Sequence, residues 1–170
     1  MFERFADGLY RVHTRTSASA SDALVADAFP ELAGRLACFG YDWLGRQFAT
    51  DAARGASDDP EVMLVEPGTG EALEIPVPFS RFHDEELVDF TEEALAHSFF
   101  QEWLRSGGAA PTPSQCVGYK RPLFLGGEDT VDNLEIVDLD VYWTIAGQLR
   151  RQTRVLPEGA PITRVVPPPA

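Results

Sequence analysis

The alternation of apolar and polar positions predicts two β-hairpins in the first half of the chain. In the segment 37–50, two aromatic-rich stretches flank Leu44-Gly45, and Gly45 can adopt the positive φ that a tight turn needs. In the segment 62–77, an apolar run is followed by the turn sequence EPGTG and then by apolar residues at every second position. A weaker alternation over residues 8–14 indicates a first strand. Together these strands predict an antiparallel sheet.

Apolar residues at helical spacing predict three helices. The first covers 22–36 and is interrupted at Pro30, because proline lacks the amide hydrogen that a helix interior needs. The second covers 79–105, has Thr91 as an N-cap, and ends where two consecutive glycines follow it. Its buried stripe is expected to contain Leu95, Phe99, Phe100, Trp103 and Leu104.

The third predicted helix covers 138–155. Acidic residues stand at its start and arginines at its end, and both placements oppose the helix dipole favourably. The arginines are Arg150, Arg151 and Arg154. The buried stripe is expected to consist of Tyr142, Ile145, Ala146 and Leu149. Pro157 should end the helix, and the tail after it is expected to fray.

Three polar segments are expected to be irregular: the Ser/Ala stretch 16–21, the polar loop 52–60, and the proline-containing linker 109–115. The predicted fold class is therefore α+β, with an antiparallel β-sheet of hairpins packed against helices. We expect two small lobes that share a core, an N-terminal lobe over 1–108 and a C-terminal lobe over 109–170.

Composition is that of an ordinary globular protein. The 170 residues are 44% hydrophobic and 24% charged, which permits a packed core. The sequence contains no apolar run long enough to span a bilayer, and its first residues lack the pattern of a signal peptide. We therefore expect a cytoplasmic protein without a membrane partner.

The charge is strongly acidic and unevenly distributed. The formal net charge is -13, and residues 58–102 contain 13 acidic residues against the single base Arg81. Such a region repels phosphate backbones and argues against nucleic-acid binding. It would suit a basic protein partner, although acidic residues also serve simply to keep a surface solvated.

Candidate catalytic and metal-binding residues form no recognisable pattern. Cys38 and Cys116 are too few for a disulfide framework and are expected to be buried free thiols. His83 and His97 lack a second histidine three or four residues away, so we expect them to bind no metal. The sequence predicts no cofactor and no enzymatic activity. A hydrolase would require a cleft that joins these residues with carboxylates.

The segment 119–135, YKRPLFLGGEDTVDNLE, looks most like a site. Acidic residues after Gly126-Gly127 would repel a phosphate, and their spacing does not match a calcium-binding loop. A structural role is therefore expected, in which Pro122 fixes φ, the apolar run 123–125 enters the core, and the glycines allow a tight turn. Asp132 or Asn133 is expected to bond to nearby backbone.

The segment 116–149, CVGYKRPLFLGGEDTVDNLEIVDLDVYWTIAGQL, resembles the C-terminal domain of the type VI secretion DNase-immunity family, a GAD-related group. It is also similar to the wider Smi/Knr-like (SUKH-type) immunity proteins. The segments FGYDWLGRQFATD (39–51) and EPGTGEALEIP (66–76) look like the GAD-like half of the family. The resemblance carries over no catalytic residues.

The resemblance implies an immunity protein that binds and neutralises a cognate toxin in the cytoplasm. The acidic region agrees with a basic toxin, such as a nuclease. The alternative is a non-catalytic regulatory or scaffold module that binds a host protein. The candidate toxin-binding residues are Asp84, Glu85, Glu86, Asp89, Glu128 and Asp129.

Overall fold

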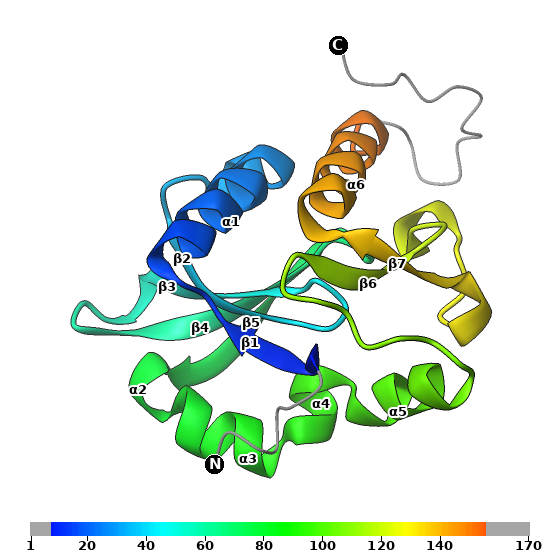
Figure 1. The fold of residues 1–170 in the computed structure, drawn as a ribbon. Helices are drawn as coiled ribbons and strands as arrows, with labels where there is room; N and C mark the ends of the chain where they lie inside the picture. Colours follow the sequence, from blue (N-terminus) through cyan, green and yellow to red (C-terminus); the bar gives the residue numbers. More distant parts are fainter. Residues whose placement is uncertain (1–7, 156–170) are drawn as a thin grey trace.

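A five-stranded antiparallel sheet lies between two layers of helices in the computed structural model, which describes residues 8–155 (Figure 1). The strands follow one another in chain order and are β1 (Tyr10–Val12), β2 (Leu36–Asp42), β3 (Gln47–Ala56), β4 (Asp59–Glu66) and β5 (Glu71–Pro78). Helices α1 (Arg15–Ala28) and α6 (Leu139–Thr153) cover one face, and short helices that follow β5 cover the other. The predicted α+β class is confirmed.

Each face of the sheet has its own apolar core because the central strands β3 and β4 are buried on both sides. Phe48 pairs with Leu64 and belongs to the core beneath the short helices. Their neighbours Ala49 and Met63 also pair, and they belong to the core beneath α1 and α6. Successive strand residues point to opposite faces, so one pair of strands supplies both cores.

The layer that follows β5 is a chain of short helices rather than the single predicted helix over 79–105. Its members are α2 (Phe79–Arg81), a π-helical turn η3 (Phe82–Glu86), α3 (Leu87–Asp89), α4 (Thr91–Leu95) and α5 (His97–Arg105). The predicted N-cap at Thr91 is wrong, since its hydroxyl donates to the carbonyl of Leu87 instead. The predicted stripe is confirmed by the burial of Leu95, Phe100 and Trp103.

A second sheet of two antiparallel strands, β6 (Gln115–Tyr119) and β7 (Leu134–Asp138), follows the linker. The 3₁₀ turns η4 (Leu123–Leu125) and η5 (Val131–Asn133) lie between its strands, and another, η2 (Pro30–Leu32), follows α1. Sequence reasoning missed β6 and β7, because each is only five residues long and its partner is distant in the chain.

Two segments expected to be irregular belong to regular elements. Helix α1 begins at Arg15 and includes 16–21, because Thr14 and Ser17 form a capping box that satisfies the first amides of the helix. Strands β3 and β4 extend through most of the expected loop 52–60, where they form the end of their hairpin. Gly55, with φ at +76°, accommodates the irregular pairing there.

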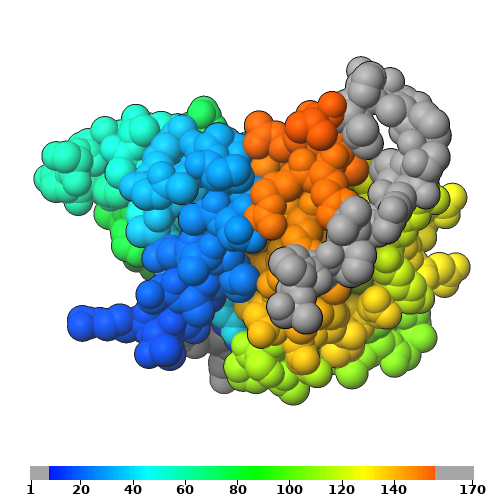
Figure 2. All heavy atoms as spheres, turned by 90° about the horizontal axis from the view of Figure 1, so that it is seen from above, coloured from blue at the N-terminus to red at the C-terminus, as the bar shows by residue number. Residues whose placement is uncertain are grey.

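Helices α1 and α6 pack side by side on the sheet (Figure 2). They approach closely, since a Cβ added to Gly147 would lie 2.8 Å from the Cβ of Ala28. The predicted stripe of α6 is partly wrong, because Ile145 is 50% exposed while Trp143 is buried. The indole of Trp143 donates to the carbonyl of Gly45 at 2.7 Å, which turns α6 so that this residue faces the sheet.

The arginines at the end of α6 have specific partners on α1 and η2. Arg150 pairs with Glu31 at 2.7 Å, and its guanidinium lies 3.8 Å from the ring centroid of Phe29. Arg151 pairs with Asp27 at 2.5 Å. Arg154 also reaches Glu31. These contacts join the two helices, in addition to any effect on the helix dipole. Pro157 and the tail lie outside the described residues.

The turn between β2 and β3 contains a buried ion network. Arg46 donates to the carboxylate of Asp42 at 2.6 Å, to Glu66 at 2.9 Å and to the carbonyl of Ala94 at 2.9 Å. The other oxygen of Asp42 accepts the amides of Leu44 and Arg46. Burial raises the pKa of Asp42 to about 6, against the opposing attraction of Arg46, so the carboxylate is ionised at neutral pH.

The same turn, residues 42–47, connects the sheet to the remaining parts of the structure. The indole of Trp43 donates to the carbonyl of Leu95 at 2.9 Å, at the end of α4. The carbonyl of Trp43 accepts the amide of Val117 in β6 at 2.7 Å. Since Gly45 holds Trp143 of α6, this one turn contacts both helical layers and the second sheet.

Replacing Arg46 with alanine should strongly destabilise the protein. It leaves the carboxylates of Asp42 and Glu66 without their cation, and we expect a loss of about 3–5 kcal/mol in the free energy of unfolding. Thermal unfolding would show this as a Tm lower by about 10 °C. The matched control is Arg81→Ala, which removes an exposed arginine paired with Glu85 and should leave Tm unchanged. Equal Tm values for the two variants would contradict a supporting role for the network.

Candidate partner-binding site

Four of the six candidate toxin-binding residues lie together on the helical layer beneath the sheet. Asp84 and Glu85 lie on η3 with Glu86, and Asp89 follows on α3. Asp84, Glu85 and Asp89 are exposed and Glu86 is half-buried. We use the term acidic helical face for Asp84, Glu86, Asp89, Glu93 and the aromatic residue Phe90, which lie on η3, α3 and α4 and the residue between them; Glu86, Asp89 and Glu93 are close enough to interact electrostatically.

The π-helical turn explains why these acidic residues face solvent. Phe82 and Leu87 are five residues apart and both are completely buried in the core. The amide of Leu87 donates to the carbonyl of Phe82, which is the i to i+5 bond of a π-helix. This wider turn brings both apolar side chains to the sheet side, and the three acidic residues between them remain on the outer side.

The acidic residues of this layer divide into two groups. Glu85 pairs with Arg81, and the carboxylate of Glu92 accepts the amide and hydroxyl of Ser98 at the start of α5. Within residues 8–155, the carboxylates of Asp84, Glu86, Asp89 and Glu93 take part in no ion pair or hydrogen bond. The acidic helical face therefore carries negative charge that the described part of the chain leaves unneutralised.

Electrostatic repulsion within the face is visible at Glu86. Its pKa lies above the ordinary glutamate value, mainly because of partial burial and also because of the nearby charges of Glu93 and Asp89. A cation placed here would relieve that repulsion. Phe90 lies beside these carboxylates in sequence and is 49% exposed, so the face combines an accessible aromatic ring with negative charge.

The other two candidates, Glu128 and Asp129, lie in the connection between β6 and β7. Figure 1 places this segment, coloured yellow-green to yellow, on a different side of the molecule from α3. Both residues are exposed, and Asp129 accepts a hydrogen bond from the hydroxyl of Tyr119 at 2.6 Å. The six candidates therefore do not form one continuous patch, and whether any of them binds a toxin stays a prediction.

The side chain of Asn133 holds the segment 119–135 together. Its amide oxygen accepts the amide hydrogen of Arg121 at 3.0 Å, and its amide nitrogen donates to the carbonyls of Arg121 and Glu128 at 2.9 and 2.8 Å. A Cβ added to Gly127 would lie 1.9 Å from the carbonyl oxygen of Arg121, so this close approach requires glycine. The expected backbone bonds of Asn133 are confirmed.

The apolar run of this segment is less buried than expected. Pro122 is buried, but Leu123, Phe124 and Leu125 are each half-buried and belong to neither apolar core. They form the 3₁₀ turn η4, and Gly126 follows it with φ at +76°. The segment therefore lies against the surface of the protein, and the prediction that these three residues enter the core is wrong.

The residues considered for catalysis do not come together in one cleft: the cysteines are buried, and each histidine lies beside a hydrogen-bonding side chain. Cys38 and Cys116 are buried free thiols, as expected, and burial raises the pKa of each well above the ordinary thiol value. His83 accepts or donates a hydrogen bond with the hydroxyl of Tyr10 at 2.9 Å. His97 lies near Gln101 on α5. Across residues 8–155, no three His, Cys, Asp or Glu side chains are grouped closely enough to hold a metal ion.

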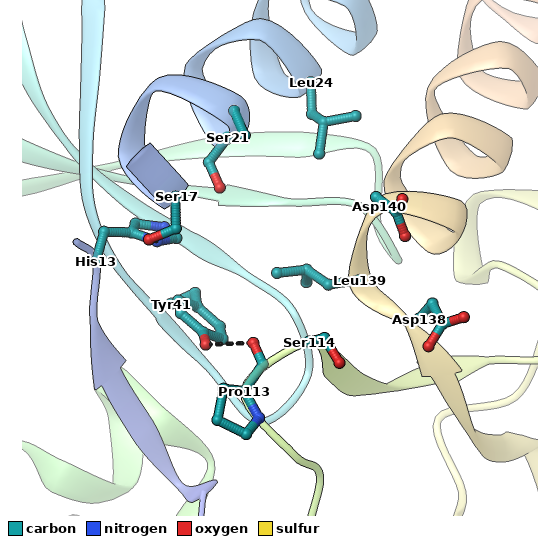
Figure 3. Close-up of a pocket in the computed structure, with 11 residues that line it drawn as sticks. His13, Ser17, Ser21, Leu24, Tyr41, Pro113, Ser114, Asp138, Leu139 and Asp140 are labelled. Atoms are coloured by element: carbon teal, nitrogen blue, oxygen red, sulfur yellow. Dashed lines mark hydrogen bonds between the residues drawn. The ribbon is translucent and has the colours of Figure 1, made fainter. Parts of the chain in front are cut away.

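Sequence reasoning also missed a pocket between α1 and the start of α6 (Figure 3). Its volume is about 400 Å³. Tyr41 forms part of its wall and donates to the carbonyl of Pro113 at 2.7 Å. The lining comes from separate parts of the chain, so no local motif could have revealed it. The residues around it are His13, Ser17, Ala20, Ser21, Leu24, Tyr41, Pro113, Ser114, Asp138, Leu139 and Asp140.

The comparisons with known proteins agree with the fold and with part of the resemblance. Residues 78–150 match the family described as "T6SS immunity protein Tdi1, C-terminal". This match confirms the predicted resemblance to a type VI secretion immunity family, and it includes both the acidic helical face and the segment 119–135. No curated protein matches the chain.

None of the helices within residues 8–155 combines the length and apolar character needed to cross a membrane.

One similar solved structure is the crystal structure of Atu4351 from Agrobacterium tumefaciens. The two chains are 19% identical and superpose with a TM-score of 0.57, over 84% of this chain and 68% of that one. At this identity the likeness shows a shared fold and nothing of the function.

Replacing Asn133 with alanine should loosen the connection between β6 and β7. Three hydrogen bonds are lost together, and at this exposed position each is expected to contribute about 0.5–1.5 kcal/mol. Amide hydrogen exchange should become faster at Arg121 and Gly127, whose positions the side chain fixes. In the control Asp132→Ala, an exposed side chain is removed from the same turn, and exchange should be unchanged. Unchanged exchange in Asn133→Ala would show that the side chain does not hold the segment.

Proposed function

We propose that this chain is an immunity protein that binds a cognate toxin and neutralises it, because residues 78–150 match the type VI secretion immunity family of Tdi1. The family match is the observation that carries this proposal. We further propose that the protein acts in the cytoplasm by binding alone, without catalysis, cofactor or metal.

The acidic helical face is the surface that we propose for the toxin. Its carboxylates have no cationic partner within the described residues, and Glu86 is repelled by its acidic neighbours, so a basic surface would be attracted to this face. Phe90 supplies the exposed aromatic ring that protein interfaces favour at their centre. Glu128 and Asp129 are proposed as a secondary contact, since they are exposed on another side of the molecule.

A nuclease is the class of toxin that this charge suits best. A nuclease must present a basic surface to the phosphate backbone of its substrate. An acidic face that occupied that surface would exclude the nucleic acid directly, because both ligands would compete for the same positive charges. Direct binding of nucleic acid by this chain is disfavoured by its net charge of -13.

Charge reversal on the acidic helical face should slow binding of the toxin. In the variant Asp84→Lys/Asp89→Lys, we expect the association rate with the cognate toxin, sought among the products of adjacent genes, to fall about tenfold at low salt, because steering is lost. The difference should shrink as salt screens the charges. The matched control is Asp58→Lys/Glu71→Lys, which changes the net charge equally at exposed positions on the hairpin ends. Surface plasmon resonance at several salt concentrations measures both rates.

Phe90→Ala separates the aromatic contribution from the electrostatic one. Removing a central aromatic contact should increase the dissociation rate about tenfold and leave the association rate nearly unchanged. If the unmodified protein binds no toxin encoded by an adjacent gene, even at low salt, the immunity proposal is wrong. If it binds but both charge-reversed variants slow association equally, the toxin uses another face.

A further inference from the structure

The pocket of Figure 3 lies on the face of the sheet opposite to the acidic helical face, and the proposed function makes no use of it. It is an open pocket, lined by α1, by the residue after β1, by β2, and by the junctions at Pro113 and Leu139. The amide of Leu139 donates to the carbonyl of Ser114 at 2.9 Å, which fixes the start of α6 against the linker. Its volume of about 400 Å³ is within the range of small-molecule sites.

The side chain of a buried residue directs an unpartnered hydroxyl into this pocket. Ser21 is only 3% exposed, and Figure 3 shows its hydroxyl pointing into the space above Tyr41. Among residues 8–155 this hydroxyl makes no hydrogen bond. The hydroxyl is accessible from the pocket, so a polar atom of a bound ligand can hydrogen-bond to it. The interior of the pocket is therefore prepared for a polar ligand.

The charge around the pocket is entirely negative. Asp138 and Asp140 lie on one side of it, and its lining includes no arginine or lysine (Figure 3). Asp140 accepts the amide of Val141 at 2.8 Å, and neither aspartate has an ion-pair partner among the described residues. An anion would be repelled here, whereas a cation would find two carboxylates that are not neutralised.

The remaining walls are apolar or already satisfied. Leu24, Leu139 and the ring of Tyr41 provide surfaces for a hydrocarbon stem. His13 uses both ring nitrogens, with Ser17 at 3.0 Å and Gln47 at 2.8 Å. Burial lowers the pKa of His13, so the ring stays neutral at neutral pH and would not repel a bound cation.

We propose that this pocket binds a small organic cation, an alkylguanidinium or alkylammonium group. The charged end lies against Asp138 and Asp140, the alkyl stem lies along the apolar walls, and Ser21 hydrogen-bonds to a polar atom at the inner end. Such a group belongs either to a free small molecule or to an arginine or lysine side chain of a bound protein. Both sources present the same chemical group to the pocket, a cation at the end of an alkyl stem.

The direct test is titration of the protein with n-butylguanidinium, followed by ¹H–¹⁵N NMR. We expect saturable shifts at the amides of Ser21, Ser114 and Leu139, with a Kd on the order of 1 mM for a ligand of this size. The neutral analogue n-butylurea has nearly the same shape and should bind at least tenfold more weakly. Shifts that do not saturate, or equal binding of both compounds, would overturn the proposal.

Two sets of variants locate the site. Ala20→Phe introduces a ring at an exposed helix position that lines the pocket, and it should abolish the shifts. Its neighbour Ser19 is also exposed but does not line the pocket, so Ser19→Phe should bind normally. Asp138→Asn/Asp140→Asn should weaken binding at least fivefold. Unchanged affinity in both pocket variants would show that the cation binds elsewhere.

A further measurement distinguishes the two sources of the cation without depending on the proposed function. If the toxin displaces n-butylguanidinium, and Ala20→Phe weakens toxin binding tenfold while Ser19→Phe does not, the pocket receives a basic side chain of the toxin. If toxin binding is unaffected, the occupant is a free small molecule. Failure of the toxin to bind at all would leave the titration result standing, because that experiment uses this protein alone.

Discussion

The buried guanidinium of Arg46 is the interaction on which the arrangement of the other elements depends. It contacts a carboxylate within its own turn, a second carboxylate at the end of β4 and a carbonyl near the end of α4. A buried arginine is stable only when all its partners are in place, since an unpaired charge in the interior is costly. The turn that carries it also provides the backbone acceptors for Val117 and Trp143. Local geometry and global packing are therefore fixed within the same turn.

The sequence was informative where local chemistry determines the outcome. The hairpin around Gly45 and the hairpin around EPGTG were both predictable, because a glycine with positive φ and alternating apolar residues are local signals. The breaks in the helical layer were not predictable by the same means. The spacing of Phe82 and Leu87 fits a π-helical turn, which a search for ordinary helical periodicity overlooks.

Other features depend on partners far away in the chain. Trp143 rather than Ile145 faces the sheet because a carbonyl nearly a hundred residues earlier accepts its indole hydrogen. The pocket likewise combines side chains of α1, β2, the linker and α6. The acidic residues of the candidate site were visible in the sequence, but their separation into a helical face and a distant connection was not. The orientation of Trp143, the pocket and the separation of the acidic residues all depend on the connectivity of the fold, which cannot be read from the sequence.

The two surfaces that carry our proposals lie on opposite faces of one sheet (Figure 1). The acidic helical face belongs to the layer that covers one core, and the pocket belongs to the layer that covers the other. Phe48 and Ala49, adjacent on β3, contact these two cores separately. The sheet, the turn that contains Arg46 and the linker from α5 to Pro113 and Ser114 are the parts of the fold that connect the two surfaces.

The position of that turn in the chain also determines when the protein can finish folding during its synthesis. The strands β1 to β5 emerge from the ribosome first and pair with their sequence neighbours, which requires only short loops to close. The carbonyls of Trp43 and Gly45, however, receive their hydrogen bonds from β6 and α6. Before β6 and α6 are synthesised, neither carbonyl has its partner, and the core beneath α1 and α6 lacks the indole of Trp143. The turn can therefore complete its hydrogen bonds only after β6 and α6 have been synthesised.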